Sequence, residues 1–158
     1  MALDRAKEYL KKYKLDNRIM LFDVSSATVR EAAIALGCKE QDIAKTLSFL
    51  IGEDPILIVV AGDAKIDNSK YKKEFGLKAK MIPGDRVEEL IGHAVGGVCP
   101  FGVNDNVKIY FDESLKRFDI VYPAAGTGNS AVKLKLEELE SSVNYEKWVD
   151  VCKVVCDE

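Results

Sequence analysis

Two apolar runs joined by a four-residue polar turn constrain the fold of this chain more than any other feature. KTLSFLI covers residues 45–51, the turn GEDP covers 52–55, and ILIVVA covers 56–61. Short apolar runs rich in Ile, Val and Leu and bounded by Gly and Pro are typical of buried strands. The pattern predicts an antiparallel hairpin through the core.

Helical and strand patterns interleave in the first half of the chain, and strands cluster in the second half. Thr28 and Glu31 form a capping-box pattern before a helix that ends at Gly37. Further helices are expected over 3–14, 67–75 and 83–92, and over the terminal WVDVCKVVC, with Cys152 and Cys156 on one face. Further strands are expected over 18–24, 79–82, 106–112, 118–124 and 131–136. This order predicts one mixed α/β domain over residues 1–158 rather than a doubly wound parallel sheet.

Charge and composition exclude several classes of function. The net charge of −3 argues against a globally basic nucleic-acid-binding surface. Apolar runs stay well short of the roughly 20 residues that span a membrane, and the N-terminus is charged from Asp4 onward. We therefore expect a cytoplasmic protein. The single histidine excludes a multi-histidine site, and the four cysteines form no CxxC pair, so we expect no metal and no cofactor.

The stretch AVGGVCPFG, residues 94–102, contains two adjacent glycines and a proline. It is not a P-loop, because no GK[ST] follows, and it is not GxGxxG, because it leads into Pro100. Its main-chain amides are able to hold a carbonyl oxygen, an oxyanion or a phosphate. From these residues alone, a plain turn and a ligand-binding loop both remain open.

Lysines supply a second set of candidate residues. Lys45 opens an otherwise apolar run, where it either extends past the strand into water or meets an anionic ligand. The segment from Lys65 to Lys80 holds six lysines, which form either a solvated helix face or a nucleic-acid contact.

Four ordered segments resemble the YbaK/EbsC family. They read LGCKEQDIAKTLSFL, ILIVVAGDAKID, GHAVGGVCPFG and IVYPAAGTGNSAVKL, and they lie between roughly residues 20 and 140. The family includes free-standing trans-editing enzymes related to the insertion domain of bacterial prolyl-tRNA synthetases. The resemblance implies a small α/β barrel with a largely antiparallel sheet and flanking helices. It also implies hydrolysis of the ester bond of mischarged aminoacyl-tRNA.

The resemblance assigns roles to particular residues. Lys45 would hold a phosphate or the terminal adenosine, and the GxxxP loop, Gly96 to Pro100 with Gly97 inside it, would engage the acyl carbonyl through its amides. A ribose hydroxyl or the thiol of a cysteinyl substrate would assist directly. Expected substrate-binding residues are Phe22, where some relatives have tyrosine, with Ser26, Thr46, Val98, Cys99, Ala124, Ala125 and Gly126. Expected tRNA-binding residues are Lys65, Lys70, Lys72 and Lys73.

Alternatives stay open at this point. Ser26 and Thr28 either cap the following helix or face the pocket. Cys99 is either a buried spacer or a thiol nucleophile activated by His93. The domain is either a deacylase, with alanine or cysteine on tRNA for proline as substrate, or a non-catalytic module. Such a module would bind an acceptor end, a nucleotide or a synthetase. Expected partners are aminoacyl-tRNA and prolyl-tRNA synthetase, with the protein a monomer or weak dimer.

Overall fold

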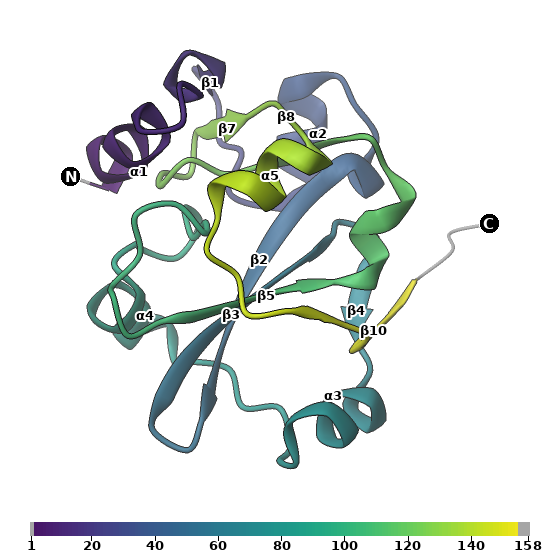
Figure 1. Cartoon of the computed structure of the whole chain (residues 1–158). Helices are drawn as coiled ribbons and strands as arrows, with labels where there is room; N and C mark the ends of the chain where they lie inside the picture. The colour runs from purple at the N-terminus through teal and green to yellow at the C-terminus, as the bar shows by residue number, and fades with distance from the viewer. Residues whose placement is uncertain (1, 155–158) are drawn as a thin grey trace.

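The predicted hairpin forms the centre of the structure, a computed structural model that describes residues 2–154 (Figure 1). Strand β2 (Ile43–Ile51) pairs antiparallel with β3 (Asp54–Ala61) over eight residue pairs, from Ala44↔Ala61 to Ile51↔Asp54. Gly52 turns the chain with a φ of +63°, a conformation that glycine adopts without strain. The side chains of 56–61 are almost entirely buried, so the hairpin prediction is confirmed.

A six-stranded sheet is built around this hairpin in the order β8-β6-β2-β3-β5-β9. Its other members are β5 (Lys108–Asp112), β6 (Ile120–Pro123), β8 (Leu134–Lys135) and β9 (Trp148–Val149). Two smaller antiparallel pairs join β1 (Ile19–Leu21) to β7 (Ser130–Val132), and β4 (Ala64–Ile66) to β10 (Cys152–Val154). More residue pairs of the sheet are antiparallel than parallel. The strand pairs β2–β6, β3–β5 and β5–β9 are parallel, so the sheet is mixed.

Between residues 2 and 154, five α-helices flank the sheet, and three of them begin and end at the predicted signals. They are α1 (Ala2–Lys11), α2 (Val29–Leu36), α3 (Asn68–Phe75), α4 (Gly84–Ile91) and α5 (Leu136–Ser142). Thr28 Oγ1 accepts a hydrogen bond from Glu31 N–H at 3.1 Å, which confirms the predicted cap of α2. Helices α2, α3 and α4 end at glycines in the left-handed conformation, namely Gly37, Gly76 and Gly92.

Three short 3₁₀ turns complete the described part of the chain, at Asp16–Arg18, Glu40–Asp42 and Glu113–Arg117. Figure 1 shows α3 at the lower end of the molecule and α4 at the left, with α5 above the crossing of β3 and β5. One hydrophobic core unites Leu10 of α1, Ile91 of α4 and Leu139 of α5 with the buried face of the hairpin. Within residues 2–154, no helix has the length and apolar character needed to cross a membrane.

Two strands in the first half of the chain are shorter than predicted. The expected strand over 18–24 stops at Leu21, and Phe22 lies beyond it, where its main chain is bonded to Asn129. The expected strand over 79–82 forms only an isolated bridge between Phe49 and Met81. Apolar composition indicated extended chain at both places, but a strand needs a partner along its whole length.

The predicted terminal helix is wrong. Cys152 begins strand β10, which pairs with β4 through Cys152↔Ile66, and Cys156 lies outside the described residues. The β-branched Val149 and Val151 alternate with polar residues and are both buried, which is the two-residue period of a strand. Pairing with β4 therefore outweighed the helical spacing of the two cysteines.

Candidate active site

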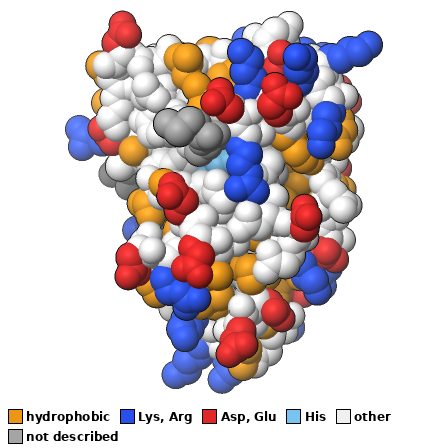
Figure 2. Space-filling view, turned by 90° about the vertical axis from the view of Figure 1, so that its left-hand side faces the viewer, with side chains coloured by type: hydrophobic (Ala, Val, Ile, Leu, Met, Phe, Trp, Pro, Cys, Tyr) orange, Lys and Arg blue, Asp and Glu red, His pale blue; other side chains and the backbone are white. Residues whose placement is uncertain are grey.

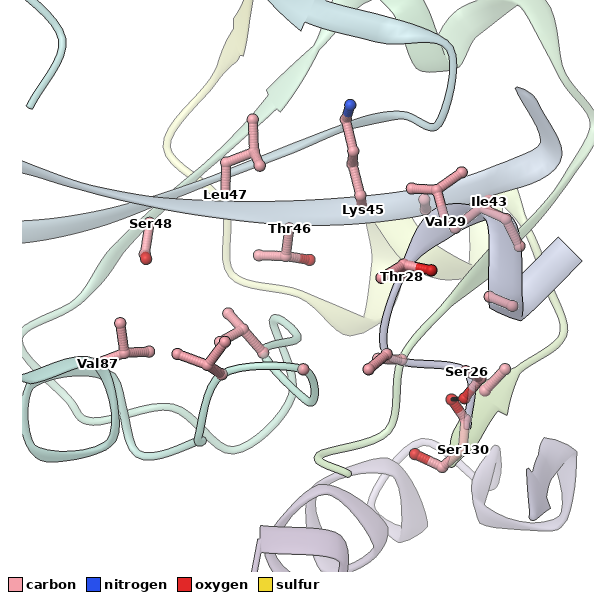
Figure 3. Close-up of a pocket in the computed structure, with 18 of the residues that line it drawn as sticks. Ser26, Thr28, Val29, Ile43, Lys45, Thr46, Leu47, Ser48, Val87 and Ser130 are labelled. Carbon is pink, nitrogen blue, oxygen red and sulfur yellow. Dashed lines mark hydrogen bonds between the residues drawn. The ribbon is translucent and has the colours of Figure 1, made fainter. Parts of the chain in front are cut away.

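A cavity of about 380 Å³ lies between β2 on one side and α4 with the loop that follows it on the other (Figure 3). Its wall is mostly apolar, with hydroxyl groups at intervals. Its lining comprises Ser26, Ala27, Thr28, Val29, Ala32, residues 43–48, Met81, Ile82, Gly84, Val87, Val95, Gly96, Val98, Tyr122, Ala124, Ser130 and Ala131. No aspartate, glutamate or histidine belongs to this set, so any reaction here relies on amides, hydroxyls and the ligand's own groups.

Three loops meet beside the cavity because glycines let their backbones approach closely. A Cβ placed on Gly97 would lie 2.5 Å from the carbonyl carbon and oxygen of Gly126, and one on Gly96 would lie 3.2 Å from Ala27 Cβ. Gly96 also has a φ of +93°. Only glycine fits the Gly97 position without moving the neighbouring backbone. The loops 94–98, 124–130 and 25–28 are therefore held together by main-chain contact.

The amides of the glycine loop are not equally available. Gly97 N–H donates to Ala94 O at 3.0 Å, which closes the turn. In the described chain, the N–H groups of Gly96 and Val98 have no hydrogen-bond partner, and both residues line the cavity. Pro100 is buried behind the loop and does not reach the cavity. The loop amides that adjoin the cavity without a hydrogen-bond partner are therefore those of Gly96 and Val98.

Lys45 is one of the residues that line the cavity, but its side chain leaves β2 on the opposite side to that of Thr46 (Figure 3). It is the third residue of β2, and Figure 3 shows Lys45 and Leu47 projecting from the opposite side of the strand to Thr46 and Ser48. Burial lowers the pKa of Lys45, Lys65 acts in the same direction, and Cys152 and Asp63 oppose the shift. Its charged neighbours thus belong to the β4–β10 side of the molecule, where an anionic ligand would favour the charged form of the amine.

Cys99 and His93 lie beneath the loop, outside the cavity lining. Both side chains are fully buried, and Cys99 Sγ lies 3.5 Å from His93 Nε2. His93 Nε2 also lies 2.6 Å from Phe101 O, and because a carbonyl only accepts, this nitrogen carries the proton. It therefore has no lone pair for the thiol, and burial raises the pKa of Cys99 to about 12. These contacts favour the buried-spacer interpretation of Cys99.

The remaining predicted residues divide into those at the cavity and those away from it. Ser26, Thr46 and Ala124 line it, whereas Phe22, Ala125 and Gly126 do not. Ala125 N–H instead donates to Ser130 Oγ at 3.2 Å and so shapes the wall from behind. The alternating pattern of β2 could have indicated Ser48, and Val87 lies on the apolar face of α4. Met81 and Val95, both exposed at the rim, carried no signal in the sequence.

The predicted tRNA-binding lysines differ in what they already contact. Lys70 Nζ is 3.1 Å from Asp150 Oδ1 and 3.0 Å from Cys152 O, which ties α3 to the segment before β10. Lys65 on β4 and Lys72 and Lys73 in the last turn of α3 are exposed. Figure 2 shows acidic and basic side chains interspersed on the face that includes α1 and α4, with no broad basic surface there. Within residues 2–154, no cluster of three metal-ligating side chains occurs.

The part of the chain that matches known proteins includes the residues that line the cavity. The family model "Aminoacyl-tRNA editing domain" matches residues 24–141, which include every lining residue. "Uncharacterized protein YwhH" of Bacillus subtilis (strain 168) is 46% identical over 154 residues, or 97% of this chain and 98% of that one. The proline–tRNA ligase of Aquifex aeolicus (strain VF5) is 29% identical over 90 residues, which are 56% of this chain but 16% of the ligase.

Solved structures agree with the sequence comparisons. A structure described as that of a candidate trans-editing enzyme for prolyl tRNA synthetase matches with a TM-score of 0.86 and 27% identity. It covers 96% of this chain and 97% of its own. The predicted mixed α/β architecture of the editing type is thereby confirmed. This chain belongs to the aminoacyl-tRNA editing domain family.

Proposed function

We propose that this protein is a trans-editing deacylase that hydrolyses the ester bond of alanyl- or cysteinyl-tRNA for proline. The observation that carries the proposal is the pair of open amides, Gly96 and Val98, at a cavity that lies wholly within the editing-domain match. An aminoacyl group placed in the cavity would present its carbonyl to these donors.

The chemistry needs little from side chains because an ester is already activated. As water attacks the acyl carbon, negative charge develops on the carbonyl oxygen, and fixed amides stabilise that charge. Removing one such donor in other enzymes costs about 3 kcal/mol. The cavity wall holds no carboxylate or imidazole to take the proton from water. The second hydroxyl of the terminal ribose relays this proton, accepting it from the water while passing its own to the ester oxygen, which leaves as the other ribose hydroxyl. In a cysteinyl substrate the thiolate form of the side chain accepts the proton from water instead.

In this proposal Lys45 binds the nucleic acid and does not contact the ester. Its side chain leaves β2 on the side away from Thr46 and is in electrostatic range of Lys65. A phosphate of the acceptor end placed there would stabilise the ammonium that burial destabilises. The aminoacyl end then enters the cavity while the preceding backbone passes over the β2 strand.

The comparison with the ligase suggests how tRNA is selected. The matched stretch is 16% of the Aquifex ligase, so this chain shares only a small part of that synthetase. We therefore propose that this chain acts in trans on tRNA charged by prolyl-tRNA synthetase, either free or in contact with that enzyme.

Release of labelled amino acid from alanyl- and cysteinyl-tRNA for proline tests the proposal. We expect rapid release by wild type and a loss of at least about tenfold in Lys45→Ala, since a charge-assisted hydrogen bond is worth about 1.5–3 kcal/mol. Lys108→Ala, an exposed lysine on β5, is the matched control and should act like wild type. Binding of aminoacyl-tRNA without release would instead identify a non-catalytic module.

A further inference from the structure

The edge of β2 is open at a single position beside the cavity. On the side away from β3, β2 pairs with β6 only through Ile43 and Ala44. Further along, the segment 80–82 takes over, because Ile82 N–H donates to Ser48 O at 3.2 Å and Leu50 N–H donates to Lys80 O at 2.8 Å. Thr46 lies between these two neighbours, so the sheet edge is interrupted there.

The main chain of Thr46 faces this gap. In an antiparallel ladder, alternate residues direct their N–H and C=O groups toward the partner strand or away from it. Ser48 and Leu50 direct theirs away from β3, toward the segment 80–82. Thr46, two residues before Ser48, must do the same. Its carbonyl oxygen therefore points away from β3, toward the open edge at the place where the cavity adjoins β2.

The side chain of Thr46 is also unsatisfied. Thr46 Oγ1 is buried and has no hydrogen-bond partner among the described residues. Figure 3 shows the side chain on the face of β2 that looks toward Val87 and the glycine loop. A buried hydroxyl without a partner costs about 1–3 kcal/mol. Two oxygen acceptors on one residue, one from the main chain and one from the side chain, are thus left for a ligand.

Three other hydroxyl groups around the cavity, those of Thr28, Ser130 and Ser26, are already engaged. Thr28 Oγ1 accepts from Glu31 N–H, and Ser130 Oγ accepts from Ala125 N–H and donates to Thr127 O. Ser26 Oγ donates to Ser130 O at 3.4 Å. Since no carboxylate lines the cavity, a cationic group of the ligand must be satisfied by neutral oxygens.

We propose that Thr46 is the receptor for the α-ammonium group of the aminoacyl substrate, through its carbonyl oxygen and Oγ1. This inference rests on the proposed function and adds the determinant by which the site recognises an amino acid rather than any acyl ester. An ammonium brings three donors, which match the two open acceptors and leave one for solvent. The acyl carbonyl remains with Gly96 and Val98.

Stable ligands separate this role from catalysis. Adenosine carrying an amide-linked alanyl group at the 3′ position has the ammonium, and its lactyl counterpart has a neutral hydroxyl in the same place. Wild type should bind the alanyl compound at least about tenfold tighter, because a hydrogen bond to a charged group is worth about 1.5–3 kcal/mol. Equal affinity of wild type for the two compounds would overturn the proposal.

Variants at Thr46 complete the test. Thr46→Val keeps the shape and removes Oγ1, so it should weaken alanyl binding by about 10-fold and leave lactyl binding unchanged. Thr46→Ser should restore the preference, and Ser48→Ala should change it little. Equal losses for both compounds in Thr46→Val would show a purely structural role. If wild type binds neither compound and releases no amino acid from tRNA, the proposed function itself fails.

Discussion

At the scale of single residues, Cys99 shows how burial decides between two chemical roles. Its thiol is enclosed beneath the glycine loop, with a pKa of about 12 caused by that burial. The neighbouring His93 nitrogen is committed to Phe101 O. A nucleophilic cysteine needs a thiolate and access to substrate, and this one has neither.

Cys99→Ala should therefore keep the deacylation rate within about twofold of wild type. The loss of a small buried side chain should cost about 1 kcal/mol of unfolding free energy. Turnover on alanyl-tRNA and urea denaturation measure the two quantities. If the variant had no turnover but the same urea midpoint of unfolding as wild type, Cys99 would again be a candidate nucleophile.

His93 should make the stability of the protein depend on pH. Burial lowers the pKa of this imidazole below its ordinary value of 6.5, and its Nδ1 has no partner among the described residues. The unfolded chain takes up a proton below about pH 6.5, whereas the folded chain resists it. Stability should thus fall on acidification, with a slope of at most about 1.4 kcal/mol per pH unit.

Comparison with His93→Gln isolates this contribution, because glutamine keeps an N–H donor for Phe101 O and has no titratable group. Unfolding free energies between about pH 7 and 5.5 should fall more steeply in wild type than in the variant. Parallel curves would show that the pKa of His93 does not differ between the folded and unfolded states.

At the scale of elements, the contact between the loops 94–98 and 124–130 depends on a missing side chain. A Cβ on Gly97 would overlap the Gly126 carbonyl, whereas one on Gly128 would meet Ala27 Cβ at an ordinary 3.4 Å. Gly97→Ala should therefore displace the Gly96 and Val98 amides and lower turnover by at least about tenfold.

Gly128→Ala is the matched control, since Gly128 lies in the facing loop and its φ is not in the left-handed region. Its turnover should stay close to that of wild type. Equal turnover of Gly97→Ala and wild type would mean that the loop is able to move without affecting the site.

Local signals in the sequence were sufficient for several elements. The Thr28 cap, the glycines that end α2, α3 and α4, and the hairpin turn at Gly52 act within a few residues, so the sequence alone predicted them. The turn is shorter than the expected 52–55, because Asp54 and Pro55 pair with Ile51 and Leu50. Strand β10 depends on pairing with β4, more than 80 residues earlier in the chain. Such long-range pairing has no local signature, and two cysteines at helical spacing indicated a helix instead.

Part of the site was likewise predictable from the sequence, and part depends on contacts between distant segments. The resemblance pointed to the glycine loop and Lys45, both of which adjoin the cavity. The open edge at Thr46 arises only when β6 and the segment 80–82 approach β2 from two sides. The occupied Gly97 amide and the direction of Lys45 also depend on the folded backbone.

At the scale of the whole molecule, the net charge of −3 requires tRNA binding to rely on local lysines. Lys65 is exposed and near Lys45, whereas Lys70 is held by Asp150 and Cys152 O. Lys65→Ala should weaken tRNA binding and reduce the dependence of log K on log salt by about 0.7–0.9. Titrations at several salt concentrations measure this slope, and an unchanged slope would remove Lys65 from the interface.

A protein that edits tRNA for proline must remove a wrong amino acid from that tRNA and spare proline. The most direct measurement compares the rates at which wild type releases alanine, cysteine and proline from the same tRNA for proline. Alanine or cysteine should leave at least about tenfold faster than proline. Equal release of all three, or release of none by the folded protein, would show that the protein does not edit.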